Sequence, residues 1–367
     1  MLLVQSERNT LLNSLSAVVG VVERRHTLPI LSNLLLEKKG GKLTLLATDL
    51  ELQISTQQAV DAGEDFAITI AARKLFDIVK ALPDAAKVKL DSKDSQVVVS
   101  AGKSRFTLQT LPAADFPRVE TGAGLGAAIT LSQKTLKRLL QLVQFAMASQ
   151  DIRYYLNGML LVLEGKQLRV VATDGHRLSY AETTLETEAE TREVIIPRKT
   201  VVELSKLLGD VDDPVELRIG ANQVTITLPG TELVTKVVDG KFPDYKRVIP
   251  NNQPRHLKAN RQNVMQALQR AAILSNEKFR GVRLVMSENA LGIVCNNNEQ
   301  EEAADEIEVS YNGEPLDVGF NVTYLLDGLG ALGSEEIILS LADANSSMLL
   351  TSEGETGFKY VVMPMRI

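Results

Sequence analysis

One short segment combines a carboxylate and a histidine closely enough to suggest hydrolytic chemistry. It reads Asp174-Gly175-His176-Arg177 and follows an apolar run. A catalytic triad needs a nucleophile, a base and an orienting group within hydrogen-bond reach, yet the whole chain has 3 histidines. A matching segment, Asp49-Leu50-Glu51, has no histidine. We interpret the segment as a structural corner that also lines a pocket, and a hydrolase using Asp174 and His176 is the alternative.

Two other groups of side chains favour binding over catalysis. Tyr154-Tyr155 could stack on unpaired nucleic-acid bases, or they could be core aromatics. The chain ends in Met363-Pro364-Met365-Arg366-Ile367, and methionines suit an adaptable groove for short peptides. The alternative for this segment is a plain closing strand.

Composition limits the class of protein. The chain has 367 residues, 44% of them hydrophobic and 23% charged, as in ordinary globular domains. The lone Cys295 argues against a disulfide framework or a zinc cluster, so we expect no metal and no cofactor. The N-terminus turns polar by Gln5 and no apolar run is long enough to span a membrane. We therefore expect a cytoplasmic protein.

The net charge of −6 argues against nucleic acid unless the charges are segregated. Segregation is indicated by three segments with amphipathic helical spacing, 8–22, 132–148 and 260–275, which contain no Asp or Glu. Their polar positions carry bases and amides: Arg8, Asn9, Asn13, Lys134, Lys137, Gln141, Gln144, Arg261, Gln262, Gln266, Gln269 and Arg270. Helix propensity is one explanation, but Glu is as good a helix former. Diffuse positive contacts to a polyanion explain the pattern better.

These segments are positioned by an internal repeat with a period of roughly 120 residues, the size of a small domain. Ala47-Thr48-Asp49, Ala172-Thr173-Asp174 and Cys295-Asn296-Asn297 end equivalent pairs of predicted strands. A second helix follows each pair, at 71–83, 197–209 and 321–333, and closing strands follow at 105–112, 232–238 and 359–365. The sequence therefore predicts an α+β protein of three repeated domains, 1–121, 129–247 and 248–367, each with two helices packed on antiparallel sheets.

Six helices per chain also allow a geometric test of a ring. Packed side by side at 8–10 Å, six helices enclose a circle too small for DNA, whereas twelve leave about 21–28 Å of free width. That admits a B-form duplex of roughly 20 Å. Two chains must then close head to tail. Lys74, Lys103 and Arg105 in the first domain complement an acidic run in the third, which contains Glu299, Glu301, Glu302, Asp305 and Glu306. A merely solvated acidic strand is the alternative.

Several long segments resemble the bacterial sliding clamp family, the beta subunit of DNA polymerase III. They are HTLPILSNLLL (26–36), SRFTLQTLPAADFP (104–117), QDIRYYLNGML (150–160), VATDGHRLS (171–179), VVDGKFPDYKRVIP (237–250), RAAILSNEKFRGVRL (270–284) and YVVMPMRI (360–367). The resemblance implies DNA-clamp domains that dimerise into a six-domain ring around duplex DNA. It implies a non-catalytic subunit of a DNA-directed DNA polymerase (nucleotidyltransferase) holoenzyme, which tethers the polymerase and other replication or repair proteins and confers processivity.

The implied partners are duplex DNA, a second copy of the chain, the polymerase alpha subunit, the clamp-loader delta subunit and other proteins with a clamp-binding motif. A clamp paralogue for repair or drug tolerance is an alternative. The resemblance implies DNA contacts at Arg25, Arg73, Gln150, Tyr154 and Tyr155, to which the helical stripe adds Lys134 and Lys137. Ser149 stands where the family usually has a histidine.

The resemblance also implies two protein interfaces. At the dimer interface, Ile273 and Leu274 are expected to pack on Phe106 and Leu108, beside the charged residues Lys74, Lys103, Arg105, Glu299 and Glu302. The partner-peptide pocket is expected to contain Leu156, Thr173, Gly175, His176, Arg177, Leu178, Pro243, Arg247, Val248, Asn345, Met363, Pro364, Met365 and Arg366. Asn345 replaces a residue that is often apolar in the family.

Overall fold

A computed structural model of the chain describes residues 2–23, 28–60, 64–120 and 124–366. These residues fall into two compact units. The N-terminal unit comprises Met1–Thr135 and Val202–Val237, and the C-terminal unit comprises Leu136–Val201 and Val238–Ile367. The central third of the chain therefore contributes strands to both units.

The six predicted helices are present, and each is shorter than predicted. The first helices of the three repeats are α1 (Arg8–Val19), α3 (Gln133–Val143) and α6 (Arg261–Ala271). The second helices are α2 (Ala72–Ala81), α4 (Arg198–Leu207) and α7 (Val322–Ala331). The first helices end early because 3-10 turns follow α3 and α6, namely η3 (Gln144–Ala146) and η5 (Ala272–Leu274). Further short helices are η1 (Pro29–Ser32), η2 (Ala113–Asp115), η4 (Tyr154–Leu156) and α5 (Tyr245–Val248).

The described strands of the N-terminal unit form two antiparallel sheets. One sheet has the order β1-β6-β7-β8, with β1 (Leu2–Glu7), β6 (Lys87–Lys93), β7 (Gln96–Ala101) and β8 (Ser104–Gln109). The other has the order β5-β2-β3-β4-β14-β13-β12-β9. Its members are β2 (Asn33–Lys39), β3 (Lys42–Thr48), β4 (Leu52–Ala59), β5 (Phe66–Ala71), β9 (Ile129–Ser132), β12 (Pro214–Ile219), β13 (Gln223–Leu228) and β14 (Thr231–Lys236). The β4–β14 pair joins the first repeat to the closing strand of the second.

The C-terminal unit follows the same plan. One sheet has the order β10-β11-β22-β21-β20-β15, with β10 (Gly158–Thr173), β11 (Arg177–Pro197), β15 (Arg255–Asn260), β20 (Glu336–Leu341), β21 (Met348–Thr351) and β22 (Phe358–Val362). The other has the order β18-β17-β16-β19, with β16 (Gly281–Ser287), β17 (Ala290–Asn296), β18 (Glu302–Glu308) and β19 (Leu316–Asn321). Here β11 pairs with β22, the closing strand of the third repeat.

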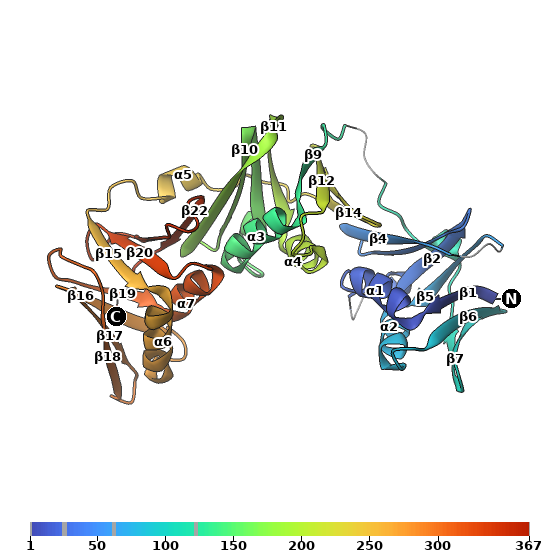
Figure 1. The fold of residues 1–367 in the computed structure, drawn as a ribbon, viewed down its shortest axis with the longest axis horizontal. Coiled ribbons are helices and arrows are strands. Elements are labelled where there is room, and N and C mark those ends of the chain that lie inside the picture. Colours follow the sequence, from blue (N-terminus) through green and yellow to red (C-terminus); the bar gives the residue numbers. More distant parts are fainter. Residues whose placement is uncertain (1, 24–27, 61–63, 121–123, 367) are drawn as a thin grey trace. The chain divides into compact units, whose positions relative to one another are not determined.

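The helices cover the sheets with the apolar faces that the sequence predicts. Helix α1 buries Leu11, Leu15 and Val18 and lies beside α2 against β3 and β4 (Figure 1). In the C-terminal unit, α6 buries Val264 and Leu268 in the same way. Burying each such side chain stabilises the fold by about 1.5–3 kcal/mol. None of the helices in the described ranges is long and apolar enough to cross a membrane.

The first residue of each long helix holds the end of the second helix in its repeat. Arg8 donates from Nε to the Val79 carbonyl at 3.1 Å and from Nη2 to the Lys80 carbonyl at 2.7 Å. Arg261 likewise donates to the carbonyls of Leu329 and Ser334. The carbonyls of Val79, Lys80 and Leu329 lie in the last turn of a helix, where partners are scarce, and those of Val79 and Leu329 also accept from the C-cap amides of Leu82 and Leu332. Ser334 lies just beyond the end of α7. Both arginines are thus committed to the fold.

The long helix of the second repeat, α3, begins with Gln133 instead, whose Oε1 accepts from the backbone amide of Gly209 at 2.9 Å, just beyond the end of α4. Two further arginines of the acid-free helices are ion-paired. Arg270 donates to Asp305 at 2.7 Å, and Arg138 donates from Nε to Glu355 at 2.8 Å. The predicted polyanion face is therefore less basic than its sequence indicates, and it depends on lysines and amides.

Candidate functional site

The segment that follows β10 forms a hydrogen-bonded corner. The Thr173 hydroxyl donates to the Arg177 carbonyl at 2.6 Å and accepts from the Gly175 amide at 3.1 Å. Asp174 Oδ1 accepts from the amides of His176 and Arg177 at 2.9 and 3.1 Å. Gly175 has a φ of +90°, which a side chain would strain. The shape of the corner is thus set by its own side chains, and contacts of Arg177 with Asp327 and Phe145 anchor it from outside.

This geometry argues against catalysis by Asp174 and His176. The second carboxylate oxygen of Asp174 accepts from Arg177 Nε at 3.0 Å, and the His176 side chain is exposed. The first repeat builds the same corner without a histidine, since Asp49 Oδ1 accepts from the amides of Glu51 and Leu52 at 3.0 and 2.7 Å. The carboxylate is therefore a turn-forming group in both repeats. Within the described ranges, no group of three or more His, Cys, Asp or Glu side chains could hold a metal ion.

A cavity of about 220 Å³ lies beside this corner in the C-terminal unit. Apolar and aromatic side chains dominate its wall, together with two arginines. The lining residues are Arg153, Tyr155, Leu156, Thr173, Gly175, Arg177, Leu178, Pro243, Val248, Val361 and Met363. Eight of these were predicted for the peptide pocket, namely Leu156, Thr173, Gly175, Arg177, Leu178, Pro243, Val248 and Met363. Residues far apart in the sequence thus meet at one preformed cavity.

The other residues predicted for the pocket do not line this cavity. The exposed Arg247 pairs with Asp244 at 3.0 Å. The backbone amide of the exposed Asn345 donates to Asp343 Oδ1 at 2.8 Å, in a turn. The Met365 amide donates to the Gly319 carbonyl at 2.9 Å, so the chain turns away after Met363. The remaining members of this group are His176, Pro364 and Arg366.

Three lining residues were not predicted for the cavity. Val361 lies on β22, where Tyr360, Val361 and Val362 are all buried, so burial along the strand does not single it out. Arg153 has no sequence signal, because it reaches the cavity from the loop before η4. Tyr155 was predicted to contact DNA, but its side chain lines the cavity, whereas its neighbour Tyr154 is 57% exposed. The tyrosine pair is thus divided between two surfaces.

One wall of the cavity is the connection between the second and third repeats. Phe242 and Tyr245 are buried against Leu160, Val171 and neighbouring apolar side chains of the sheet. These two anchors hold Pro243 and Val248 at the rim. The hydrophobic effect therefore fixes a segment that would otherwise be a linker.

The loop before η4 is organised by an ion pair. Asp151 accepts from Arg153 Nη2 at 2.8 Å and from the Arg153 amide at 2.8 Å. The Arg153 hydrogen bonds lower the pKa of the Asp151 carboxyl from 3.8 to about 2. Arg153 Nη2 also donates to the Asp174 carbonyl at 3.2 Å, which connects this loop to the corner.

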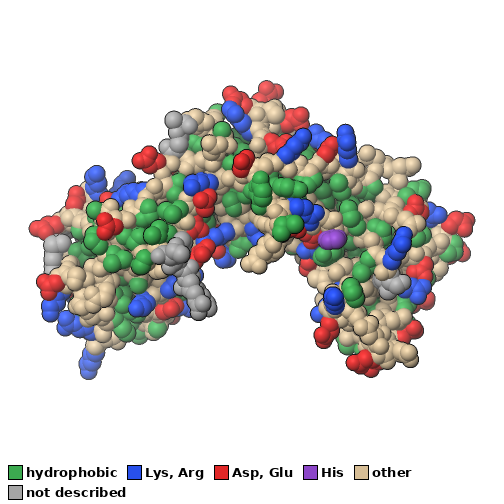
Figure 2. Space-filling view, turned by 180° about the vertical axis from the view of Figure 1, so that it is seen from behind, with side chains coloured by type: hydrophobic (Ala, Val, Ile, Leu, Met, Phe, Trp, Pro, Cys, Tyr) green, Lys and Arg blue, Asp and Glu red, His purple; other side chains and the backbone are tan. Residues whose placement is uncertain are grey.

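The residues predicted to contact DNA lie on several elements. Gln150 is exposed with a φ of +57°, Lys134 is exposed on α3, and Lys137 is partly buried. Arg73 is exposed on α2, although its Nη2 donates to the Val22 carbonyl. Arg25 lies outside the described residues. On the face that Figure 2 shows, acidic and basic side chains are intermixed.

The residues predicted for a dimer interface lie at two edge strands, one in each unit. Phe106 is on β8 and is 38% exposed, while Leu108 on the same strand is buried. Lys103 and Arg105 are exposed beside it, and Lys74 is exposed on α2. Ile273 in η5, close to β18, is 79% exposed. With Leu274 and Glu299, it lines a polar cavity of about 430 Å³, whereas Glu302 is exposed on β18 outside that cavity.

Comparisons with known proteins identify the family. Three family models of the DNA polymerase III beta subunit match the chain: the N-terminal domain at residues 3–120, the central domain at 130–244 and the C-terminal domain at 246–366. The beta sliding clamp of Pseudomonas aeruginosa is 47% identical, covering 98% of this chain and 99% of that protein. That of Escherichia coli K12 is 46% identical over the same shares. A crystal structure of the Pseudomonas aeruginosa clamp bound to griselimycin matches with a TM-score of 0.95 and 46% identity over 99% of both chains.

Three α+β repeats, joined by shared sheets, define a DNA clamp, and the predicted fold class is confirmed. The chain belongs to the family of the bacterial DNA polymerase III beta subunit, the beta sliding clamps. It is a non-catalytic subunit that confers processivity on DNA polymerase III, so the hydrolase alternative is not supported.

Proposed function

We propose that two copies of the chain close head to tail around duplex DNA, and that each copy presents the cavity beside Arg177 to short linear peptides. The peptides would come from the polymerase alpha subunit, the clamp-loader delta subunit and other proteins with a clamp-binding motif. The ring would act in the cytoplasm and slide without reading sequence, because closure rather than affinity keeps it on DNA.

The preformed cavity is the observation that carries the docking proposal. Its wall combines apolar side chains such as Leu156, Leu178 and Val361 with the flexible Met363, which is 43% exposed. Such a surface buries apolar peptide side chains and adapts to different ones. Tethering a partner there raises its local concentration at the template.

The two edge strands support head-to-tail closure. An exposed sheet edge invites pairing with another chain, and β8 and β18 are edges of their sheets. The β8 edge carries basic residues and an exposed Phe106, whereas β18 carries acids and adjoins the exposed Ile273. Opposite charge and matching apolar contacts favour pairing of unlike ends, which closes a ring.

Replacing Met363 with Ala tests the docking proposal. A bound peptide would cover the exposed part of Met363, and losing a methionine side chain buried in this way removes about 1.5–3 kcal/mol of contact. We therefore expect a peptide with a clamp-binding motif to bind about 10- to 100-fold more weakly. Calorimetric titration of the peptide measures this. Val211→Ala is the matched control, because Val211 is 45% exposed and lies outside the cavity. Equal affinity in the Met363 variant and the unmodified chain would refute docking at this cavity.

A further inference from the structure

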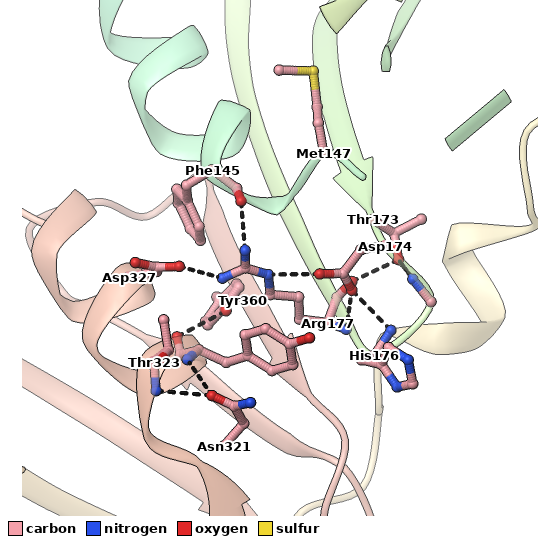
Figure 3. A network of polar contacts seen from close by, with 12 residues as sticks. Phe145, Met147, Thr173, Asp174, His176, Arg177, Asn321, Thr323, Asp327 and Tyr360 are labelled. Carbon is pink, nitrogen blue, oxygen red and sulfur yellow. Dashed lines mark hydrogen bonds and ion pairs between the residues drawn. The ribbon is translucent and has the colours of Figure 1, made fainter. Parts of the chain in front are cut away.

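Arg177 lines the cavity, but its guanidinium is bound to three other positions (Figure 3). Nε donates to Asp174 Oδ2 at 3.0 Å within the corner. Nη1 donates to Asp327 Oδ2 at 2.6 Å, and Nη2 donates to the Phe145 carbonyl at 2.7 Å. The side chain of Arg177 is 10% exposed. Each of its three nitrogens therefore donates within the protein.

Aromatic rings enclose the same guanidinium. Its carbon lies 4.4 Å from the centroid of the Tyr324 ring and 5.5 Å from that of Phe145. The Tyr360 ring meets the Phe145 ring edge-on at 5.3 Å, and its hydroxyl donates to the Tyr324 carbonyl at 2.9 Å. Burial alone would lower the pKa of Arg177, but Tyr360 and Asp327 outweigh it and hold that pKa above its ordinary value. Moving this charge toward a ligand would leave Asp327 without its partner, which is costly.

Outside the corner, three residues that contact the Arg177 guanidinium belong to two helical segments. Phe145 lies in η3, directly after α3, while Tyr324 and Asp327 lie on α7. Asn321 caps α7, accepting from the amides of Thr323 and Tyr324 at 2.9 and 3.3 Å (Figure 3). One side chain thus connects the cavity wall to the end of one helix and the first turns of another.

We propose that Arg177 is a positioning residue that transmits occupancy of the cavity to α7 and to the end of α3. The identity of the occupant, a clamp-binding peptide, rests on the proposed function. Thr173, Gly175 and Leu178 line the cavity on the same corner, so a ligand that orders the corner also orders the guanidinium. Phe145 and Asp327 are then held more firmly. The coupling is reciprocal: weakening the α7 contact loosens the cavity wall.

Asp327→Asn tests the link while preserving side-chain volume. In the free protein, we expect the amides of residues 175–178 to exchange hydrogen at least threefold faster, because the corner loses one of its anchors. In the unmodified chain, saturation with a synthetic clamp-binding peptide slows exchange in α7 and η3, and the variant loses this α7 response. Asp317→Asn is the matched control, because Asp317 pairs with Arg283, in an ion pair that shares no residue with the contacts of Arg177. Both effects should be absent in that variant.

Two results would overturn the inference. One is unchanged exchange at residues 175–178 in free Asp327→Asn protein, which needs no ligand. The other is peptide protection of Leu178 in the unmodified chain without any change in α7. A peptide that protects neither Leu178 nor α7 would instead refute docking at this cavity, and the free-protein comparison would still decide the role of Arg177.

Discussion

The side chains of Thr173 and Asp174 hold the turn together, and the pocket lies beside that turn. Thr173 and Asp174 each accept backbone amides, as Thr48 and Asp49 do in the first repeat. Short oxygen-bearing side chains favour such turns, so the corner could be predicted from sequence. The partner of Arg177 could not, because Asp327 is 150 residues away and nothing local marks it.

The Asp151–Arg153 pair gives a prediction for pH. Because the pKa of Asp151 is lowered in the folded chain, its ion pair is present above about pH 4 and is lost as the pH falls toward 2. NMR titration of the carboxyl should give a pKa of about 2. Arg153→Ala should move this pKa toward 3.8, whereas Arg218→Ala, which removes a surface partner of Glu216, should leave it unchanged. A pKa near 3.8 in the unmodified chain would contradict this geometry.

Helices and strands could be predicted largely from periodicity, because each element buries one face. Their ends could not, since the 3-10 turns after α3 and α6 depend on tertiary packing. The packing of the connections between repeats could not be predicted from the sequence pattern either. Phe116 packs on Leu35 and Leu46 in the same way that Phe242 packs on the second repeat.

The two connections differ in the contacts that hold them beyond the buried Phe116 and Phe242. In the first, the buried Gln53 donates to the Val119 carbonyl at 3.3 Å and accepts from its amide at 2.8 Å. In the second repeat, the equivalent strand position is Leu178, which lines the cavity instead. An amide at this position fastens the connection, whereas an apolar side chain leaves a surface for a ligand.

Replacing Gln53 with Ala should release the first connection. Losing two hydrogen bonds costs about 1–3 kcal/mol in the free energy of unfolding, and exchange of the Val119 amide should rise at least tenfold. Denaturant unfolding and hydrogen exchange measure the two effects. Gln57→Ala on the same strand is the control, since the Gln57 side chain is exposed. Unchanged protection of Val119 would show that Gln53 does not fasten this segment.

The three repeats share one order of helices and strands, yet their closing strands pair differently, which gives the whole molecule several distinct surfaces. Strand β4 pairs with β14, and β11 pairs with β22, so the closing strands of the second and third repeats each extend a sheet of the preceding repeat. Strands β8 and β18 are among the sheet edges that remain, and they are the two that we propose pair with a second chain. The sequence predicted the three repeats because their strands and corners recur. The role of the arginines on the long helices was missed, because their partners lie on distant elements.

The ring that we propose is linked to DNA topologically. The direct measurement loads the protein onto circular DNA with a clamp loader and follows its retention through gel filtration before and after the DNA is linearised. We predict retention on the circle and loss from the linear form. Ile273→Asp, which places a charge at the proposed interface, should be retained on neither. Equal retention of the unmodified protein on circular and linear DNA would contradict encirclement.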